Sequence, residues 1–126
     1  MSTSVMVFER DPLVREGLCE LLRGWDFDVI AAAGPDTDSR LERTSKPPDF
    51  AIVTAPDGDG AAGAAWVATV QARYGRLPII FIADRLTCGA TPQNCVQIDW
   101  PVQANRLRAA IADITLNRRA VHGSSA

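Results

Sequence analysis

The residues of this chain that could do chemistry follow its short apolar runs. The run 50–53 ends on Thr54, and the loop after it carries Asp57 and Asp59. A carboxylate is an anion near neutral pH, so it can attack phosphorus or bind a hard cation without help from a base. A threonine hydroxyl needs a neighbouring base before it becomes a nucleophile. The sequence therefore places the weaker group at the strand end and holds the carboxylates back in the loop.

General bases and metal ligands are scarce in this sequence. The only histidine is His122, near the C-terminus, and the three cysteines are Cys19, Cys88 and Cys95. An odd number of cysteines at irregular spacing makes a poor disulfide framework, and Cys88 and Cys95 are not at a usual zinc-ligand spacing. We therefore expect reduced thiols, no metal site and no catalysis that depends on histidine.

The composition is that of a single globular domain. The chain has 126 residues, 47% of them hydrophobic and 22% charged, which suits one core but not two. Its formal net charge of −2 gives no sign of nucleic-acid binding. No apolar run reaches the roughly 18 residues that a membrane span needs, and the first residues lack the pattern of a signal peptide. We predict a cytoplasmic protein that binds neither nucleic acid nor membranes.

Strand-like and helix-like segments alternate along the chain. Apolar runs predict strands at 4–8, 27–33, 49–54, 77–83 and 96–98. Helices are predicted within 10–24, at 60–74 and 102–119, and more weakly at 35–44. In the first helix, Asp11 is a good N-cap, Pro12 suits the first helical position, and Gly24 can end the helix in a left-handed conformation.

Each of the three stronger helices has an apolar side that predicts how it packs. In the first helix, one face carries Val14, Leu18, Leu21 and Leu22. In the second, the heavier contacts are expected from Trp66, Val67 and Val70. In the last, the residues expected to face inward are Leu107, Ala110, Ile111 and Ile114. The second of these helices is rich in alanine and glycine, so we expect it to lie close on a sheet.

Five strands that alternate with helices predict a doubly wound α/β fold, in which a parallel sheet is covered by helices on both faces. Functional sites in such folds form at the carboxyl ends of the strands. The residues at these ends are Glu9, Arg10 and Asp11 after the first strand, Thr54 after the third, Ala83 after the fourth, and Trp100 and Pro101 after the fifth.

In their order and spacing, these segments resemble the receiver domain of bacterial two-component response regulators. The stretches "VMVFERDPLVREGLCELLRGWDFDVIAAA", "PDFAIV" with "PDGDG", "LPIIFIA" and "WPVQANRLRAAI" resemble successive parts of that domain over nearly the whole chain. The resemblance implies a flavodoxin-like, CheY-like topology with strand order 2-1-3-4-5. It implies one domain over 1–120 and a flexible tail at 121–126. Segment 84–95 is too short for the family's usual fourth helix, which we expect to be shortened or missing.

The resemblance also assigns functional positions, and this chain departs from the family at nearly all of them. The family's acidic pair, which holds Mg²⁺, is Glu9-Arg10 here. The phospho-acceptor aspartate corresponds to Thr54, the hydroxyl residue ending the fourth strand to Ala83, and the lysine before the proline to Trp100. We therefore expect a degenerate phosphorylation pocket that is not an enzyme site and binds Mg²⁺ weakly or not at all.

Three residues near this pocket have more than one reading. Asp57 is either a displaced phospho-acceptor or a turn former in "PDGDG". Arg10 either replaces the metal with a built-in cation, paired with Glu9, Asp11 or Asp57, or points into solvent. Trp100 either fills the vacated pocket or binds a partner.

The function implied is phosphorylation-independent protein–protein interaction in bacterial signalling. Expected partners are a histidine kinase, a phosphotransfer protein or another receiver, and a homodimer is possible. The candidate interaction surface lies on the first and last helices and comprises Val14, Arg15, Leu18, Arg106 and Arg108. The alternatives are a receiver phosphorylated at Asp57 in a phosphorelay and a small-ligand sensor that uses the strand-end crevice.

Overall fold

A computed structural model describes residues 3–34, 48–55, 60–84 and 95–124 of the chain. Within these ranges its strands are β1 (Ser4–Phe8), β2 (Asp28–Ala32), β3 (Phe50–Thr54), β4 (Ile79–Ala83) and β5 (Cys95–Asp99). The helices are α1 (Pro12–Gly24), α3 (Gly60–Tyr74) and α4 (Ala104–Ser124). The helix expected at 35–44 lies wholly outside the described residues. Segment 84–95, where the family's fourth helix is expected to be shortened or missing, lies largely outside them.

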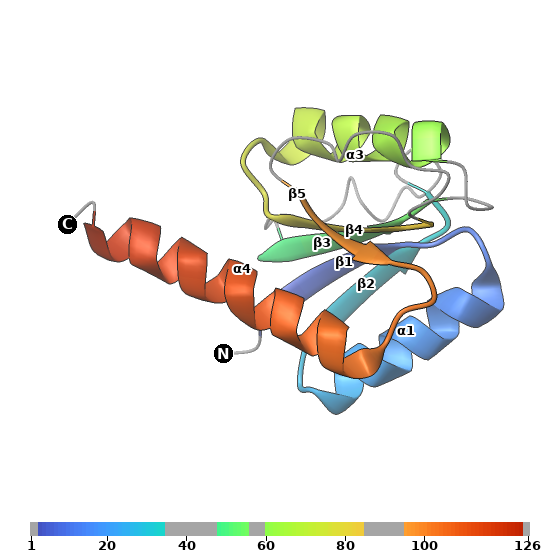
Figure 1. The fold of residues 1–126 in the computed structure, drawn as a ribbon, viewed down its shortest axis with the longest axis horizontal. Coiled ribbons are helices and arrows are strands. Elements are labelled where there is room, and N and C mark those ends of the chain that lie inside the picture. Colours follow the sequence, from blue (N-terminus) through green and yellow to red (C-terminus); the bar gives the residue numbers. More distant parts are fainter. Residues whose placement is uncertain (1–2, 35–47, 56–59, 85–94, 125–126) are drawn as a thin grey trace.

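All five strands form one parallel sheet in the order β2-β1-β3-β4-β5, which confirms the predicted topology (Figure 1). The register places Phe8 beside Val53, Thr54 beside Ile82 and Ala83 beside Asp99. The carboxyl ends of β1, β3, β4 and β5 therefore meet at one edge of the sheet, where sites form in this class of fold.

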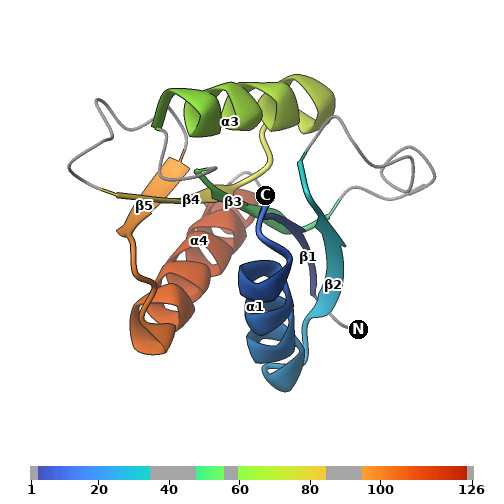
Figure 2. The same cartoon turned by 90° about the vertical axis from the view of Figure 1, so that its right-hand side faces the viewer.

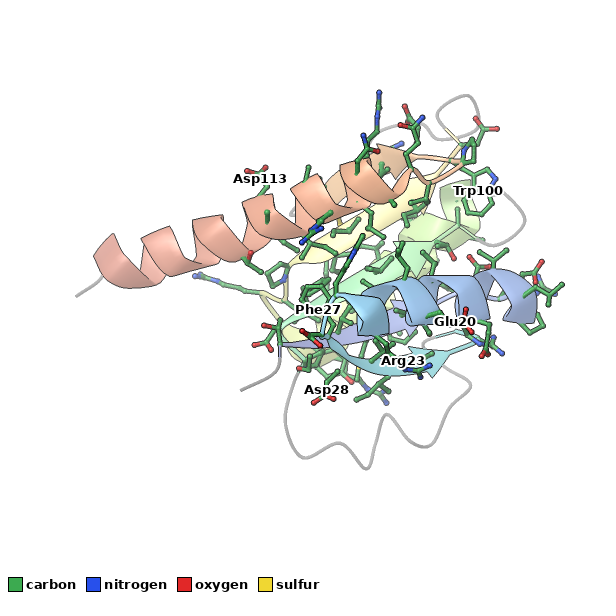
Figure 3. The ribbon with its side chains drawn as sticks, turned by 90° about the horizontal axis from the view of Figure 1, so that it is seen from below. Glu20, Arg23, Phe27, Asp28, Trp100 and Asp113 are labelled. Atoms are coloured by element: carbon green, nitrogen blue, oxygen red, sulfur yellow. The ribbon has the colours of Figure 1, made fainter. Side chains whose placement is uncertain are left out.

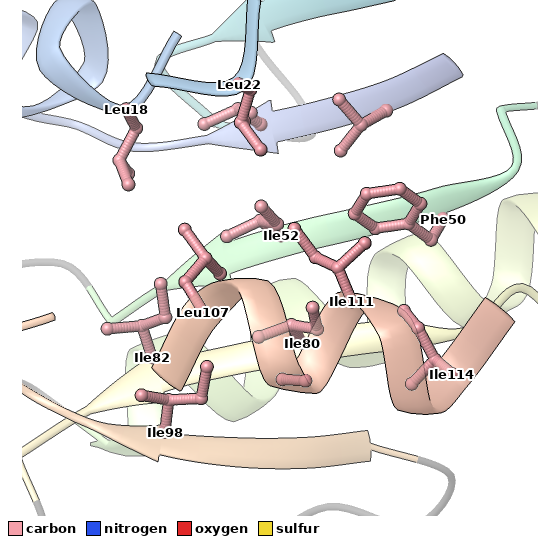
Figure 4. Close-up of a cluster of buried hydrophobic side chains, with 13 residues drawn as sticks. Leu18, Leu22, Phe50, Ile52, Ile80, Ile82, Ile98, Leu107, Ile111 and Ile114 are labelled. Carbon is pink, nitrogen blue, oxygen red and sulfur yellow. The ribbon is translucent and has the colours of Figure 1, made fainter. Parts of the chain in front are cut away.

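Helices cover both faces of the sheet, because β1, β3 and β4 are apolar on both sides. Figure 2 shows α3 on one face and α1 with α4 on the other. Along β3, Phe50 and Ile52 point to the cluster under α1 and α4, whereas Ala51 and Val53 point to the cluster under α3. The larger cluster is drawn in Figure 4. All five residues of β3 and of β4 are buried, so the middle of the sheet is covered on both faces.

Helix α1 spans the residues that the sequence predicts, but the left-handed residue that follows it is a different one. Asp11 is the N-cap, and its side chain accepts hydrogen bonds from the amides of Leu13 and Val14. The left-handed residue is Asp26, with φ 67°, and not Gly24, so that expectation was wrong. The amides of Asp26 and Phe27 donate to the carbonyl groups of Arg23 and Leu22, the bonding pattern of a Schellman motif.

The position of the left-handed residue, after the end of α1, has a packing reason. Because the chain reverses at Asp26, Phe27 is carried over the sheet and packs edge-on against Phe50, with the ring centroids 5.6 Å apart. A reversal at Gly24 would shift Phe27 away from this contact. Apart from glycine, Asp is one of the few residues that tolerate the left-handed backbone conformation.

Helix α3 lies close on the sheet, as its small residues predict. A Cβ atom placed on Gly63 would be 2.7 Å from the ring of Phe81 and 3.0 Å from the Cα atom of Ala55. The heavier residues expected to anchor this helix do so, since Val67 and Val70 are buried and Trp66 packs against the same cluster. Gly63 is therefore needed for the close contact between α3 and the sheet.

Helix α4 buries its predicted apolar side. Leu107, Ala110, Ile111 and Ile114 all join the cluster that α1 also covers. The helix begins at Ala104, two residues later than predicted, and runs to Ser124, into the segment expected to be a flexible tail. No proline interrupts the sequence between 102 and 124, so the backbone hydrogen bonds can continue. None of the described helices is long and apolar enough to span a membrane.

Candidate functional site

A cavity of about 320 Å³ lies at the carboxyl edge of the sheet, where the receiver resemblance places a phosphorylation pocket. Its ionisable and polar lining residues are Glu9, Arg10, Asp11, Thr54 and Asp84. Its apolar lining residues are Val14, Ala55, Ile82, Ala83 and Trp100. The topology thus brings together six of the eight residues predicted for this pocket. Pro101 is exposed and is not among the lining residues, and Asp57 lies outside the described part of the chain.

Thr54 is buried and its hydroxyl is engaged with β1. The side chain is 2% exposed, and Oγ1 lies 3.1 Å from the carbonyl oxygen of Phe8. The same oxygen makes a hydrogen bond with carboxylate oxygen Oε2 of Glu9. The single hydroxyl proton serves these two acceptors, so the group at the phospho-acceptor position acts as an internal hydrogen-bond donor.

Glu9 makes hydrogen bonds to several segments at the carboxyl end of the sheet. It is 7% exposed, although a buried carboxylate is costly unless hydrogen bonds compensate for lost water. Oxygen Oε1 accepts from the amide of Asp11 at 2.9 Å, and Oε2 is bonded to Thr54. The guanidinium of Arg15 donates to the Glu9 carbonyl oxygen at 2.9 Å. Glu9 therefore ties the end of β1 to β3 and to the start of α1.

We tested whether these residues fit the Mg²⁺ ion that the receiver resemblance implies. Mg²⁺ requires several oxygen ligands in near-octahedral order. Both carboxylate oxygens of Glu9 already accept hydrogen bonds, one carboxylate oxygen of Asp11 caps α1, and β3 offers a hydroxyl. The guanidinium of Arg10 adds a positive charge to the same cavity. The set does not fit Mg²⁺.

Trp100 and Ala83 form the β4–β5 side of the cavity. The Trp100 amide donates to the Ala83 carbonyl oxygen at 3.1 Å, which fixes the chain as it leaves β5. The Trp100–Pro101 peptide bond is cis. The Trp100 side chain lines the cavity and is 47% exposed, so the cavity stays open beside it. Figure 3 shows Trp100 on the right of the view, well apart from Phe27 and Asp28.

Arg10 lies on the exposed rim of the cavity. Its pairing with Glu9, Asp11 or Asp57 in place of a metal stays a prediction. The carboxylate of Glu9 is hydrogen-bonded to the amide of Asp11 and to the hydroxyl of Thr54, a network that sequence reasoning missed. Thr54 and Glu9 are 45 positions apart, so no local pattern in the sequence indicates their contact. The signal that could have indicated it is that both residues lie at the carboxyl ends of strands.

Only some of the residues predicted for the candidate interaction surface are exposed. Leu18 is 7% exposed and belongs to the core, so its place on an exposed surface was wrong: it lies on the inward side of α1. Val14 is half-buried and lines the cavity, and Arg15 is half-buried against Glu9. Arg106 and Arg108 are exposed on α4. A surface residue that sequence reasoning missed is Leu13, which is 83% exposed at the start of α1.

A second cavity, of about 270 Å³, lies between the end of α1 and the middle of α4. Its lining includes Trp25, Phe27, Arg108 and Ile111. The guanidinium carbon of Arg108 is 5.6 Å from the centroid of the Trp25 ring, within range of a cation–π interaction. This contact orients Arg108 on the surface that α1 and α4 share.

The two described cysteines are poor nucleophiles. Burial raises the pKa of the Cys95 thiol to about 11. Burial also raises the pKa of Cys19, against the opposing effect of Arg23. Since the thiolate is the reactive form, both side chains stay protonated near neutral pH. Neither is in a disulfide bond, in agreement with the expectation of reduced thiols for these two.

The sequence shows a distant likeness to a known regulator. No protein-family model matches the chain. The phyllosphere-induced regulator PhyR of Methylorubrum extorquens is 27% identical over 116 residues, which cover 89% of this chain and 43% of the regulator. The chain therefore spans less than half the length of this relative.

The fold is shared with solved receiver domains. The receiver domain of Erythrobacter litoralis PhyR matches with a TM-score of 0.72 and 23% identity, over 91% of each chain. The receiver domain of the sensor histidine kinase PA1611 of Pseudomonas aeruginosa, solved with a magnesium ion in its active-site cleft, matches with a TM-score of 0.65 and 18% identity, over 86% of this chain and 93% of that one. The chain has the CheY-like fold of response-regulator receiver domains.

Proposed function

We propose that this chain is an atypical receiver domain of bacterial signal transduction, which acts by binding other proteins and does not depend on phosphorylation at the end of β3. The receiver fold and the likeness to PhyR support the signalling role. On this proposal, the domain is not an enzyme and needs no Mg²⁺.

The observation that carries the proposal is the hydrogen bond between Thr54 and Glu9. Transfer of a phosphoryl group needs a nucleophile and positive charge to offset the transferring oxygens. The hydroxyl of Thr54 is buried and faces a carboxylate, which repels an incoming phosphoryl group. The position of the family's hydroxyl residue is occupied by Ala83, and that of its lysine by Trp100. The groups that would hold the phosphoryl oxygens are therefore lacking at these two positions.

The test is incubation with acetyl phosphate and Mg²⁺, followed by intact-mass measurement. We expect no phosphate adduct on the wild-type chain, and no difference between the wild type and Asp57→Ala. An adduct on the wild type that is lost in Asp57→Ala would overturn the proposal in favour of a displaced phospho-acceptor. An adduct lost in Thr54→Val would overturn it in favour of phosphorylation at the strand end.

The partner on this proposal is a signalling protein such as a histidine kinase, a phosphotransfer protein or a second receiver. Exposed Arg106 and Arg108 on α4 support a partner that offers acidic groups to this helix. A pull-down from the native cell with wild type and with Arg106→Glu/Arg108→Glu would identify it. We expect the double variant to lose one or more partners that the wild type captures, with the fold checked by circular dichroism.

A further inference from the structure

The cavity between the end of α1 and the middle of α4 lies at the other end of the sheet from the degenerate phosphorylation pocket. Thr3 and Phe27 line it, and they directly precede β1 and β2. Because the strands are parallel, the cavity lies at their amino ends, and Figure 3 shows Phe27 well apart from Trp100. The two cavities share no lining residue in the described part of the chain. The receiver resemblance assigns no role to this one.

The walls of this cavity are mostly apolar. Trp25 and Phe27 contribute aromatic side chains from the end of α1, and Ile111 and Ala112 contribute aliphatic ones from α4. Arg108 is the one charged residue among the described lining residues. The volume of about 270 Å³ is just below the roughly 300–1,000 Å³ of most small-molecule sites. It therefore suits one or two side chains of another protein better than a whole cofactor.

Arg108 is held in place but keeps its hydrogen-bonding capacity. Its guanidinium carbon lies 5.6 Å from the centroid of the Trp25 ring. Within the described part of the chain, this guanidinium makes no hydrogen bond and no ion pair. The group has five N–H donors in a planar fork that matches the two oxygens of a carboxylate. Because Trp25 already restricts the side chain, pairing with a carboxylate costs less conformational entropy.

The acidic residues nearby in the sequence do not line the cavity. Phe27 and Val29 pack against the cluster under α1 and α4, whereas Ile30 packs against the cluster under α3. Successive side chains of a strand point to opposite faces of the sheet, so Asp28 shares the face of Ile30, away from the cavity. Asp26 is exposed in the turn after α1 and is not a lining residue either. The positive charge of the cavity is therefore available to an outside carboxylate.

We propose that the cavity at the amino end of the sheet receives an acidic side chain of a different protein, together with an apolar side chain next to it. The carboxylate pairs with Arg108, and the apolar side chain lies against Phe27 and Ile111. This inference rests on the proposed function, because it states where the domain binds its partner. Charge complementarity selects the acidic group, and the aromatic and aliphatic walls select its neighbour.

The experiment is an NMR titration of the ¹⁵N-labelled full chain with the blocked dipeptide acetyl-phenylalanyl-glutamate amide. The matched control ligand is acetyl-phenylalanyl-glutamine amide, which has nearly the same shape and no charge. The indole signal of Trp25 is identified by its loss in Trp25→Phe. We expect a saturable shift of this indole and of the Phe27 and Ala112 amides, with an affinity on the order of millimolar.

Matched variants locate the recognition. Arg108→Gln should weaken binding of the glutamate dipeptide by about two- to five-fold, the range of an exposed ion pair, and remove the preference over the glutamine dipeptide. Arg108→Lys keeps the charge without the planar fork and should restore part of the loss. Arg106→Gln, at an exposed position of α4 outside the cavity lining, should leave binding unchanged. Asp28→Asn should not weaken it.

Several outcomes would overturn the inference. They are no saturable shift, equal binding of the two dipeptides, or equal effects of Arg108→Gln and Arg106→Gln. Binding of butyrate as tight as that of the glutamate dipeptide would overturn a protein as the source and identify a site for small carboxylates. Shifts of the same amides that grow with the concentration of the chain alone would overturn a different protein in favour of a second copy. A phosphate adduct in the mass experiment would instead overturn the proposed function, so the two failures are distinguishable.

Discussion

The interior of the sheet and its carboxyl end are made from the same strands but are held together by different forces. In the interior of β3, the side chains of residues 50–53 pack into two apolar clusters. One residue later, Thr54 is equally buried, yet its contacts are hydrogen bonds to Phe8 and Glu9. Apolar packing tolerates changes in proportion to volume, whereas a buried polar pair fails when one partner is removed.

The largest expected effect belongs to the interior. Ile52→Ala removes a fully buried side chain from the cluster under α1 and α4, where the cavity left behind cannot collapse easily. We expect the free energy of unfolding to fall by about 2–5 kcal/mol, measured by urea denaturation. The strand-end cavity should keep its form, so an altered indole signal from Trp100 in the folded variant would contradict the separation of the two regions.

The next effect belongs to the polar pair. Thr54→Val keeps the shape but leaves the Glu9 carboxylate without one donor, which should cost about 1–3 kcal/mol of unfolding free energy. Thr54→Ser keeps the hydroxyl and should cost only about 1 kcal/mol for the lost methyl group.

A double-mutant cycle with Glu9→Gln isolates the interaction of the pair. We expect a coupling energy of about 0.5–3 kcal/mol between positions 9 and 54, as for residues in one hydrogen-bond network. Additive effects, within the error of urea denaturation, would show that the two side chains act independently. The carboxyl end would then be held by packing, like the interior.

The smallest of these effects concerns the cap of α1, at the rim of the same cavity. Asp11→Ala removes the acceptor for the amides of Leu13 and Val14, and should lower the unfolding free energy by about 1 kcal/mol. The matched control is Leu13→Ala, which should change it by less than about 0.5 kcal/mol because Leu13 is 83% exposed. Equal losses in thermal and urea unfolding for both variants would mean that the cap does not stabilise α1.

Most of the fold could be predicted from the sequence, because its signals are local. The strands of the central sheet are runs of branched apolar residues, and Asp11-Pro12 marks the start of α1 by its own chemistry. The apolar faces of α1 and α4 and the larger side chains of α3 could be identified from the sequence, and the structure places them in the two clusters. The left-handed residue Asp26 did not follow, since the reversal there is coupled to the contact of Phe27 with Phe50, which lies on β3.

Six of the eight residues predicted for the candidate site line the cavity, but their hydrogen bonds were not predicted. Parallel strands must bring their carboxyl ends to one edge, so Glu9, Thr54, Ala83 and Trp100 could be grouped from the sequence. That Glu9 accepts from Thr54, and that Trp100 leaves the cavity open, depends on side-chain directions that no local pattern records.

The sequence by itself determined which groups this protein has at the strand ends: a hydroxyl at position 54, a methyl group at 83 and an indole at 100. It also determined the strands and helices of the sheet that carries these groups, because apolar runs and helix caps are local signals that span only a few residues. Only the tertiary structure decided how these groups are used. The hydrogen bond between Thr54 and Glu9 joins residues 45 positions apart, and it forms because polar groups that the fold buries together need hydrogen-bond partners within it.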